Sequence, residues 1–128
     1  MKIAVDTNRY RDFCSGVPEV VDRFTAVDQI HLPFVVLAEL RAGFLCGTAG
    51  KRNESVLGHF LNRDRVRVLF ADEETTHHYA RIFAQLRKQG TPIPTNDIWI
   101  AALTMQHDLL LYSRDVHFEH LPQLPRLE

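Results

Sequence analysis

Four short apolar runs alternate with segments of helical periodicity, and this alternation is the feature that most constrains the fold. The runs are too short for helices and are rich in residues that favour strands. They cover residues 2–5, 31–36, 66–70 and 109–112. Strands separated by helices need crossover connections, which produce a mainly parallel sheet with helices on both faces. The sequence therefore predicts an α/β fold, a three-layer sandwich built on four or five strands.

The clearest helix is predicted over residues 72–89. Its first turn is acidic, its last turn carries Arg87 and Lys88, and Gly90 follows, which suits the helix dipole and a glycine stop. Further helices are predicted over residues 9–14, 18–27, 37–45 and 56–61, and from residue 95 to about 107. The tail from Leu121 contains two prolines, so we expect a surface coil or a short edge strand.

Length and composition are those of an ordinary globular protein. The 128 residues suit one domain spanning 1–128, and the chain is 45% hydrophobic and 24% charged. Fifteen Lys and Arg against sixteen Asp and Glu give a net charge of -1, so any affinity for a polyanion must be local. Cys14 and Cys46 lack metal-ligand spacing, and we expect reduced thiols in a cytoplasmic protein. No apolar run approaches the length of a membrane span, so we expect neither secretion nor membrane insertion.

The stretch at residues 91–102, TPIPTNDIWIAA, places one carboxylate at the start of an apolar helix. Its two prolines favour an extended approach, and Thr95 or Asn96 can cap the helix. Residues 98–102 are apolar on most faces, so this helix should be buried on most sides. Asp97 alone could simply be a carboxylate that favours the helix dipole.

Three other acids are placed to meet Asp97. Asp6 ends the first apolar run, Glu39 lies within about one turn of the second, and Asp115 follows the fourth. The carboxyl ends of parallel strands emerge along one edge of the sheet, where ligands of open α/β folds bind. Each acid alone could belong to a turn or a solvated helix face. Their joint placement on one edge instead indicates a site.

Grouped carboxylates repel one another, and some of their pKa values should rise unless a cation neutralises them. Oxygen ligands with water suit Mg²⁺ or Mn²⁺ rather than zinc. One or two such ions can activate water and stabilise the attacking and leaving oxygens of a phosphodiester. The four acids therefore indicate a metal-dependent nuclease.

Four motifs carry a family resemblance that spans nearly the whole chain. They are Val-Asp-Thr-Asn at 5–8, Leu-Ala-Glu-Leu at 37–40, Ile-Pro-Thr-Asn-Asp-Ile-Trp-Ile-Ala-Ala at 93–102 and Ser-Arg-Asp-Val-His-Phe at 113–118. In this order they resemble the successive motifs of PIN-domain ribonucleases, particularly VapC-type toxins. The third motif is the most specific. Ser113 stands where Thr is commoner, which keeps the hydroxyl.

The resemblance implies a fold, a site and partners. The catalytic and metal-binding acids would be Asp6, Glu39, Asp97 and Asp115, and the supporting polar side chains Thr7, Asn96 and Ser113. It also implies Mg²⁺ or Mn²⁺ as the cofactor, an RNA substrate and a homodimer. The last implied partner is a cognate antitoxin that blocks the site, so that the protein is the toxin of a type II toxin–antitoxin system.

An acidic cleft needs a cationic rim to hold RNA. The candidates near the acids in sequence are Arg9, Arg11, Arg41 and Arg114, and Tyr10 could stack on an unpaired base. These arginines could equally be surface charges, and Arg41 could instead neutralise Glu39.

Other sites and functions fit the sequence less well. His117 and His120 are three residues apart but lack a third ligand nearby, which disfavours zinc. A phosphoacceptor switch domain also gathers acids at the edge of a parallel sheet, yet it usually needs a lysine near the site. The only lysines are Lys2, Lys51 and Lys88, and none is well placed. A non-catalytic RNA-binding protein on the same fold is disfavoured because all four acids are present.

Overall fold

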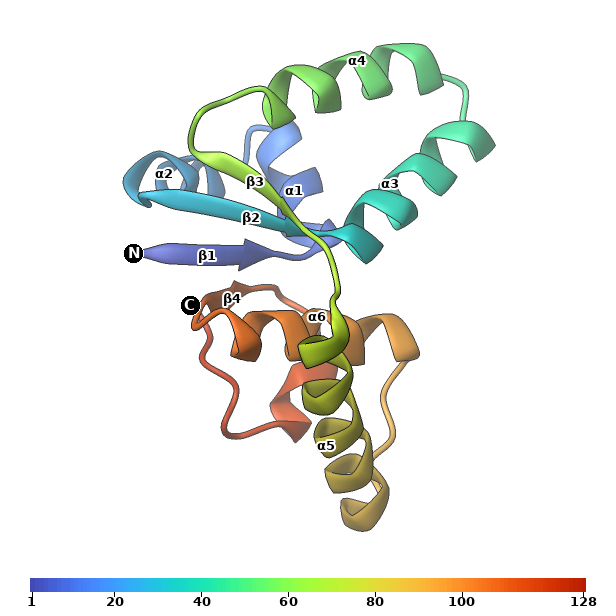
Figure 1. Cartoon of the computed structure of the whole chain (residues 1–128). Helices are drawn as coiled ribbons and strands as arrows, with labels where there is room; N and C mark the ends of the chain where they lie inside the picture. Colours follow the sequence, from blue (N-terminus) through green and yellow to red (C-terminus); the bar gives the residue numbers. More distant parts are fainter.

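A computed structural model shows four parallel strands between two layers of helices (Figure 1). The strands are β1 (Lys2–Val5), β2 (Gln29–Pro33), β3 (Val66–Leu69) and β4 (Leu110–Tyr112), in the order β3-β2-β1-β4. The helices are α1 (Thr7–Cys14), α2 (Pro18–Ala26), α3 (Phe34–Cys46), α4 (Gly50–Leu61), α5 (Glu73–Gln89) and α6 (Thr95–Gln106), followed by the 3₁₀ helix η1 (Val116–His120). The predicted α/β class with a parallel sheet is confirmed.

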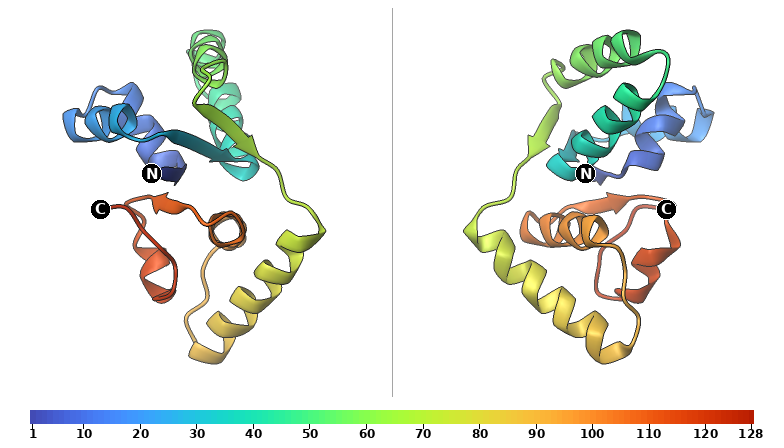
Figure 2. Two further views of the ribbon diagram at one scale, coloured as in Figure 1. Left: turned by 60° about the vertical axis from the view of Figure 1, so that its left-hand side comes forward. Right: turned by 90° about the vertical axis from the view of Figure 1, so that its right-hand side faces the viewer.

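The two helical layers follow from the direction in which the chain crosses the sheet. From β1 to β3 it moves steadily toward one edge, and right-handed crossovers place α1 to α4 on one face. It then returns past β1 to form β4, so α5 and α6 cover the opposite face, as Figures 1 and 2 show. β1 and β4 are adjacent, and the segments that follow them leave toward opposite faces. The crevice at their carboxyl ends is the switch point where open α/β folds bind ligands.

A cluster of 31 buried hydrophobic residues fills the space on both sides of the sheet. Ile3, Ala4 and Val5 of β1 are fully buried, as expected of a central parallel strand. In α6, Ile98 and residues 100–103 are also buried, which confirms the prediction of a helix buried on most sides. The site elements are therefore anchored in the core.

The second strand ends earlier than predicted. β2 stops at Pro33 and α3 begins at Phe34, so residues 34–36 are helical. Pro33 lies opposite Leu69, the last residue of β3, and no strand continues beyond that pair. Further extended chain would leave its backbone groups without partners on that side, whereas a helix satisfies them internally. As a result Glu39 lies in the second turn of α3 instead of at its opening.

Two helix starts differ in how they are capped. α5 has the predicted bounds within one residue, with an Asp72–Thr75 capping box and Gly90 in the left-handed conformation at its end. For α6, the prediction that Thr95 or Asn96 caps the helix is wrong. Pro94 occupies the cap position, and no side chain bonds to the first free backbone amides.

The carboxyl-terminal tail is a short edge element with buried anchors. The backbone N–H of Leu111 donates to the Pro125 carbonyl, and the N–H of Leu127 donates to the Leu111 carbonyl, both at 2.9 Å. Leu121 and Leu124 are buried, so the tail also closes the core beneath β4. None of the helices is long and apolar enough to cross a bilayer.

Candidate active site at the carboxyl ends of β1 and β4

Asp6 lies at the junction of β1, α1 and β4. Its backbone N–H extends the strand pairing by donating to the Tyr112 carbonyl at 3.1 Å, which brings it beside Ser113. Its side chain caps α1 by accepting from the N–H of Thr7 at 2.8 Å. The other carboxylate oxygen accepts from Ser113 Oγ at 2.7 Å and from Asn8 Nδ2 at 3.4 Å. Asp6 is thus held rigidly from both strands.

The pKa of the Asp6 carboxyl is raised. Burial is the main cause, and the negative charges of Glu39 and Asp115 add to it. The hydrogen bonds from Ser113 and Thr7 act in the opposite direction without cancelling the effect. The charged form of Asp6 is therefore costly in the absence of a cation.

Glu39 approaches the other acids from α3 and is oriented by two of the predicted supporting residues. Thr7 Oγ1 donates to Glu39 Oε2 at 2.9 Å, and Asn96 Nδ2 donates to Glu39 Oε1 at 3.0 Å. Because helix side chains lean toward the amino terminus, a glutamate in the second turn can reach back to these partners. Both carboxylate oxygens are thus tied to α1 and to α6.

Asp97 and Asp115 form the other side of the candidate site, with His117 between them. His117 Nδ1 lies 2.8 Å from Asp97 Oδ2 and 3.0 Å from Asp115 Oδ1. Asp115 also caps η1, since its Oδ1 accepts from the N–H of His117 at 2.9 Å. One donor atom from each of the three residues lies within 4.8 Å of the others. Such a group can hold a metal ion.

Burial raises the pKa of Asp97 to about 6, even though His117 donates to it. The neighbouring Asp115 and Asp6 also raise this pKa. The hydrogen bond to Asp97 raises the pKa of His117, and the negative charge of Asp115 raises it further. The four predicted acids therefore lie close enough to influence one another's charge.

The donor set fits a divalent cation. Its centre is the group of Asp97, Asp115 and His117, with the carboxylates of Asp6 and Glu39 nearby. Burial, assisted by the neighbouring carboxylates, raises the pKa values of Asp6 and Asp97. Oxygen-rich sets of this kind suit Mg²⁺ or Mn²⁺. Asp97, Asp115 and His117 are the residues nearest to one another, while Asp6 and Glu39 flank them. With a divalent cation held between them, these residues could stabilise negative charge on a bound phosphodiester.

His117 was not among the predicted site residues. The sequence shows it three residues before His120, without a third ligand nearby, and the missing partners come from Asp97 on another element and from Asp115. His120 does not belong to this group. The usable signal was its place two residues after Asp115, because a single turn of 3₁₀ helix returns its ring toward that carboxylate.

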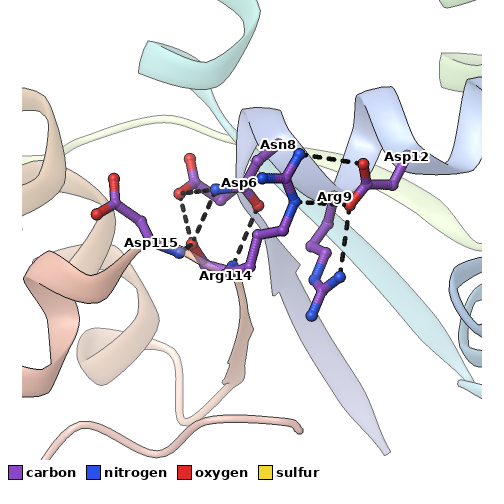
Figure 3. Close-up of polar contacts among 7 residues, drawn as sticks. Asp6, Asn8, Arg9, Asp12, Arg114 and Asp115 are labelled. Carbon is purple, nitrogen blue, oxygen red and sulfur yellow. Dashed lines mark hydrogen bonds and ion pairs between the residues drawn. The ribbon is translucent and has the colours of Figure 1, made fainter.

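Asp12 of α1 holds two of the predicted arginines, as Figure 3 shows. Arg114 Nε and Nη2 donate to its two carboxylate oxygens at 3.0 and 3.2 Å, and Arg9 Nη1 donates at 3.4 Å. These arginines lower the pKa of Asp12, with the Arg114 hydrogen bond as the largest cause. The N–H of Arg114 also donates to Asn8 Oδ1 at 3.2 Å. Neither Asp12 nor Asn8 was predicted, and only the folded chain brings them beside residues 113–115.

The remaining predicted contacts with RNA have different surroundings. Tyr10 is 3% exposed and packs edge-on against Phe60, so it cannot stack on a base, and that interpretation is corrected. Arg41 pairs with Glu54 at 3.0 Å and does not neutralise Glu39. Arg11 is exposed and makes no ion pair. It is the one predicted rim arginine whose charge is uncompensated.

The sequence was compared with those of known protein families and characterised proteins. The sequence matches the PIN domain family over residues 4–124. It is 31% identical over 111 residues to Ribonuclease VapC1 of Haemophilus influenzae, which covers 84% of this chain and 80% of that protein. It is also 27% identical over 103 residues to Ribonuclease VapC4 of Mycobacterium tuberculosis, covering 80% and 78%.

Solved structures show the same fold. VapBC-1 from nontypeable Haemophilus influenzae aligns with a TM-score of 0.88 at 26% identity, covering 100% of this chain and 98% of that one. DNA-bound VapBC from Salmonella typhimurium aligns with a TM-score of 0.86 at 28% identity, covering 100% and 97%. The chain therefore belongs to the PIN domain family. Several of the relatives that it matches are named VapC ribonucleases, as the resemblance indicated.

Proposed function

We propose that this chain is a metal-dependent endoribonuclease and the toxin of a type II toxin–antitoxin pair. The observation that carries the proposal is the convergence of Asp6, Glu39, Asp97 and Asp115 at the switch point of a parallel sheet. Relatives named VapC ribonucleases support RNA as the substrate. Neighbours solved as VapBC complexes support an antitoxin partner.

Each acid has a proposed role. Asp97, Asp115 and Asp6 would hold Mg²⁺ or Mn²⁺ directly or through water, and Glu39 would hold a second ion or orient the attacking water. A bound divalent cation supplies Lewis-acid stabilisation of phosphate oxygens and makes water a better nucleophile at neutral pH. Thr7 and Asn96 keep Glu39 aimed into the cleft through their hydrogen bonds to its two oxygens. Ser113 does the same for Asp6.

Cationic residues on the rim would hold the RNA backbone. Arg9 and Arg114 share the single negative charge of Asp12, so together they retain one net positive charge beside the acids. Arg11 adds a second, because nothing pairs with it. Neutralisation of phosphates by such groups makes binding salt-dependent. Arg41 contributes less, since Glu54 already compensates its charge.

A phosphoacceptor switch fits the structure less well. Lys2 begins β1, at the opposite end of that strand from Asp6, and Lys51 and Lys88 lie in α4 and α5. None of the three donates a hydrogen bond to the acids, and Asp6 is already engaged by three donors. A non-catalytic RNA-binding protein would have no use for four gathered carboxylates, two of which, Asp6 and Asp97, have raised pKa values.

The nuclease is tested with purified protein and structured RNAs, in Mg²⁺, in Mn²⁺ and in chelator. Asp97→Asn should reduce cleavage at least about a hundredfold, because loss of a metal ligand removes several kcal/mol of transition-state stabilisation. The matched control is Asp108→Asn, an exposed aspartate just after the same helix. Cutting that persists in chelator, or equally in Asp97→Asn, contradicts the metal mechanism.

The toxin role is tested in the same variants by induced expression in a bacterium. The wild type and Asp108→Asn should arrest growth, and Asp97→Asn should not. Co-expression of a small protein encoded beside this gene should relieve the arrest and co-purify with the chain. Sustained growth despite active nuclease would remove the toxin role and leave the enzyme intact. The expected homodimer rests on the family resemblance. The expected cytoplasmic location rests on the two unpaired cysteines, Cys14 and Cys46.

A further inference from the structure

We infer that His117 is a metal ligand through Nδ1, and that it makes this site prefer Mn²⁺ over Mg²⁺. The inference deepens the proposed function, because it concerns the same cation site. It concerns a residue that the four-acid interpretation omits. Its starting point is the group of three donor atoms from Asp97, Asp115 and His117 within 4.8 Å of one another.

The two separations that involve His117 match those of adjacent ligands around a small octahedral cation. Ligand atoms about 2.1 Å from such an ion lie about 3 Å apart when they occupy adjacent positions. His117 Nδ1 is 2.8 Å from Asp97 Oδ2 and 3.0 Å from Asp115 Oδ1. The imidazole nitrogen therefore already stands where a third ligand would stand, and no large movement of the ring is needed. To coordinate the ion, Nδ1 releases the proton that it donates to Asp97, and the neutral ring keeps its one proton on Nε2.

The residues on either side of His117, Asp115 and Phe118, hold its ring in this position. The backbone N–H of His117 donates to Asp115 Oδ1, so one carboxylate positions both the turn and the ring. The next residue, Phe118, is fully buried and anchors η1 in the core. Asp97 is 8% exposed at the start of the buried helix α6. The His117 ring itself is 42% exposed, so hydrogen bonds and the two anchored elements hold the donors in place. A site with donors held in this way favours a metal that suits them.

The chemistry of the nitrogen decides the preference. Mg²⁺ favours oxygen ligands and keeps several waters, whereas imidazole suits transition metals. Of the two ions that suit the carboxylates, only Mn²⁺ is a transition metal, so one added imidazole favours it over Mg²⁺. In the alternative role, His117 only donates a hydrogen bond to Asp97 and never touches the ion. That role would support all divalent cations alike, so the two can be distinguished.

The decisive measurement is the electron spin echo of Mn²⁺ bound to the protein, which detects nitrogen directly coordinated to the ion. Wild-type protein should show ¹⁴N modulation that changes to the ¹⁵N pattern after uniform ¹⁵N labelling. His117→Ala should lose the modulation, while His120→Ala, in the same 3₁₀ helix but outside the donor group, should keep it. His117→Gln is prepared in parallel, so that the result does not depend on one variant folding.

Affinity provides the second readout, without RNA. In calorimetric titrations His117→Ala and His117→Gln should weaken Mn²⁺ binding at least about tenfold and leave Mg²⁺ binding nearly unchanged. Absence of nitrogen modulation in the wild type, or equal weakening of both ions, overturns the inference. These results are independent of catalysis. A protein that cuts RNA without nitrogen coordination loses only this inference, and one with nitrogen coordination but no cleavage loses only the proposed nuclease.

Discussion

At the scale of single residues, two aspartates in the same type of position have opposite electrostatics. Asp6 and Asp72 each cap a helix, α1 and α5. Burial and neighbouring carboxylates raise the pKa of Asp6, whereas hydrogen bonds from Gln106 and Thr75 lower the pKa of exposed Asp72. The cap at Asp72 serves the fold. The cap at Asp6 serves the fold only at an electrostatic cost, as expected where function opposes stability.

The prediction at this scale concerns Asp6→Asn in chelator at neutral pH. The amide keeps an oxygen for the N–H of Thr7 and removes a buried negative charge beside Glu39 and Asp115. The melting temperature should therefore stay the same or rise by a few degrees. Differential scanning calorimetry of metal-free protein measures it.

Asp72→Asn is the matched control, because it makes the same change at a helix cap. Here the charge is favourable, and the melting temperature should not rise. A large drop for Asp6→Asn, equal to or beyond that of Asp72→Asn, would show that Asp6 is a structural residue instead of a strained site residue.

At the scale of elements, Asp12 connects α1 to the loop that follows β4. The two-pronged hydrogen bond from Arg114 and the Asn8 contact with the Arg114 backbone tie residues 113–115 to α1 (Figure 3). Asp115 belongs to this loop, and Asp6 precedes this helix. The connection thus fixes the two aspartates relative to each other, although Asp12 itself is not part of the donor group. We regard Asp12 as a positioning residue.

Asp12→Asn should lower kcat for RNA cleavage about tenfold, because small misplacement of reacting groups is costly. KM should not rise, since the change releases Arg9 and Arg114 to contact phosphates. Steady-state kinetics at fixed ionic strength separate the two parameters, with Asp22→Asn, an exposed aspartate of α2, as the control. An unchanged kcat with a raised KM would instead assign the ion pairs to RNA binding.

At the scale of the whole molecule, two stretches of chain meet along one seam. Residues 2–69 supply β1 to β3 and α1 to α4, and the rest supplies α5, α6, β4 and η1, as the turned views of Figure 2 show. The seam runs through the β1–β4 pairing. Trp99 lies on this seam. The centroid of its ring is 4.4 Å from that of Tyr79 in α5 and 6.3 Å from that of Phe34 in α3. The four acids of the candidate site come from both stretches, so they are brought together only when the seam is closed.

We therefore predict that the chain unfolds as a single domain. The fluorescence of Trp99, the only tryptophan, and far-ultraviolet circular dichroism should give coincident transitions in urea. The physical reason is that both stretches contribute to one continuous hydrophobic core, so neither has a core of its own. Two separate transitions, with fluorescence changing first, would show that the stretches are independent units.

The sequence by itself determined the fold class, and it predicted that the four acids would lie near one another. Apolar runs and helical periodicity depend on which side chains must leave water, and parallel strands bring their carboxyl ends to one edge whatever the detailed packing. The bounds of α5 were also predictable, because Asp72 and Gly90 act locally. Where β2 ends was not, since that depends on how far its neighbour β3 extends.

Only the tertiary structure decided which other residues join the acids. His117 meets Asp97 across 20 residues of sequence, and Asp12 meets Arg114 across 102. The prediction that Tyr10 contacts RNA is wrong because Phe60 of α4 covers its ring. Spacing along a chain shows which side chains share a helix face or a strand end. It does not show which elements approach one another, because that depends on the packing of the whole core.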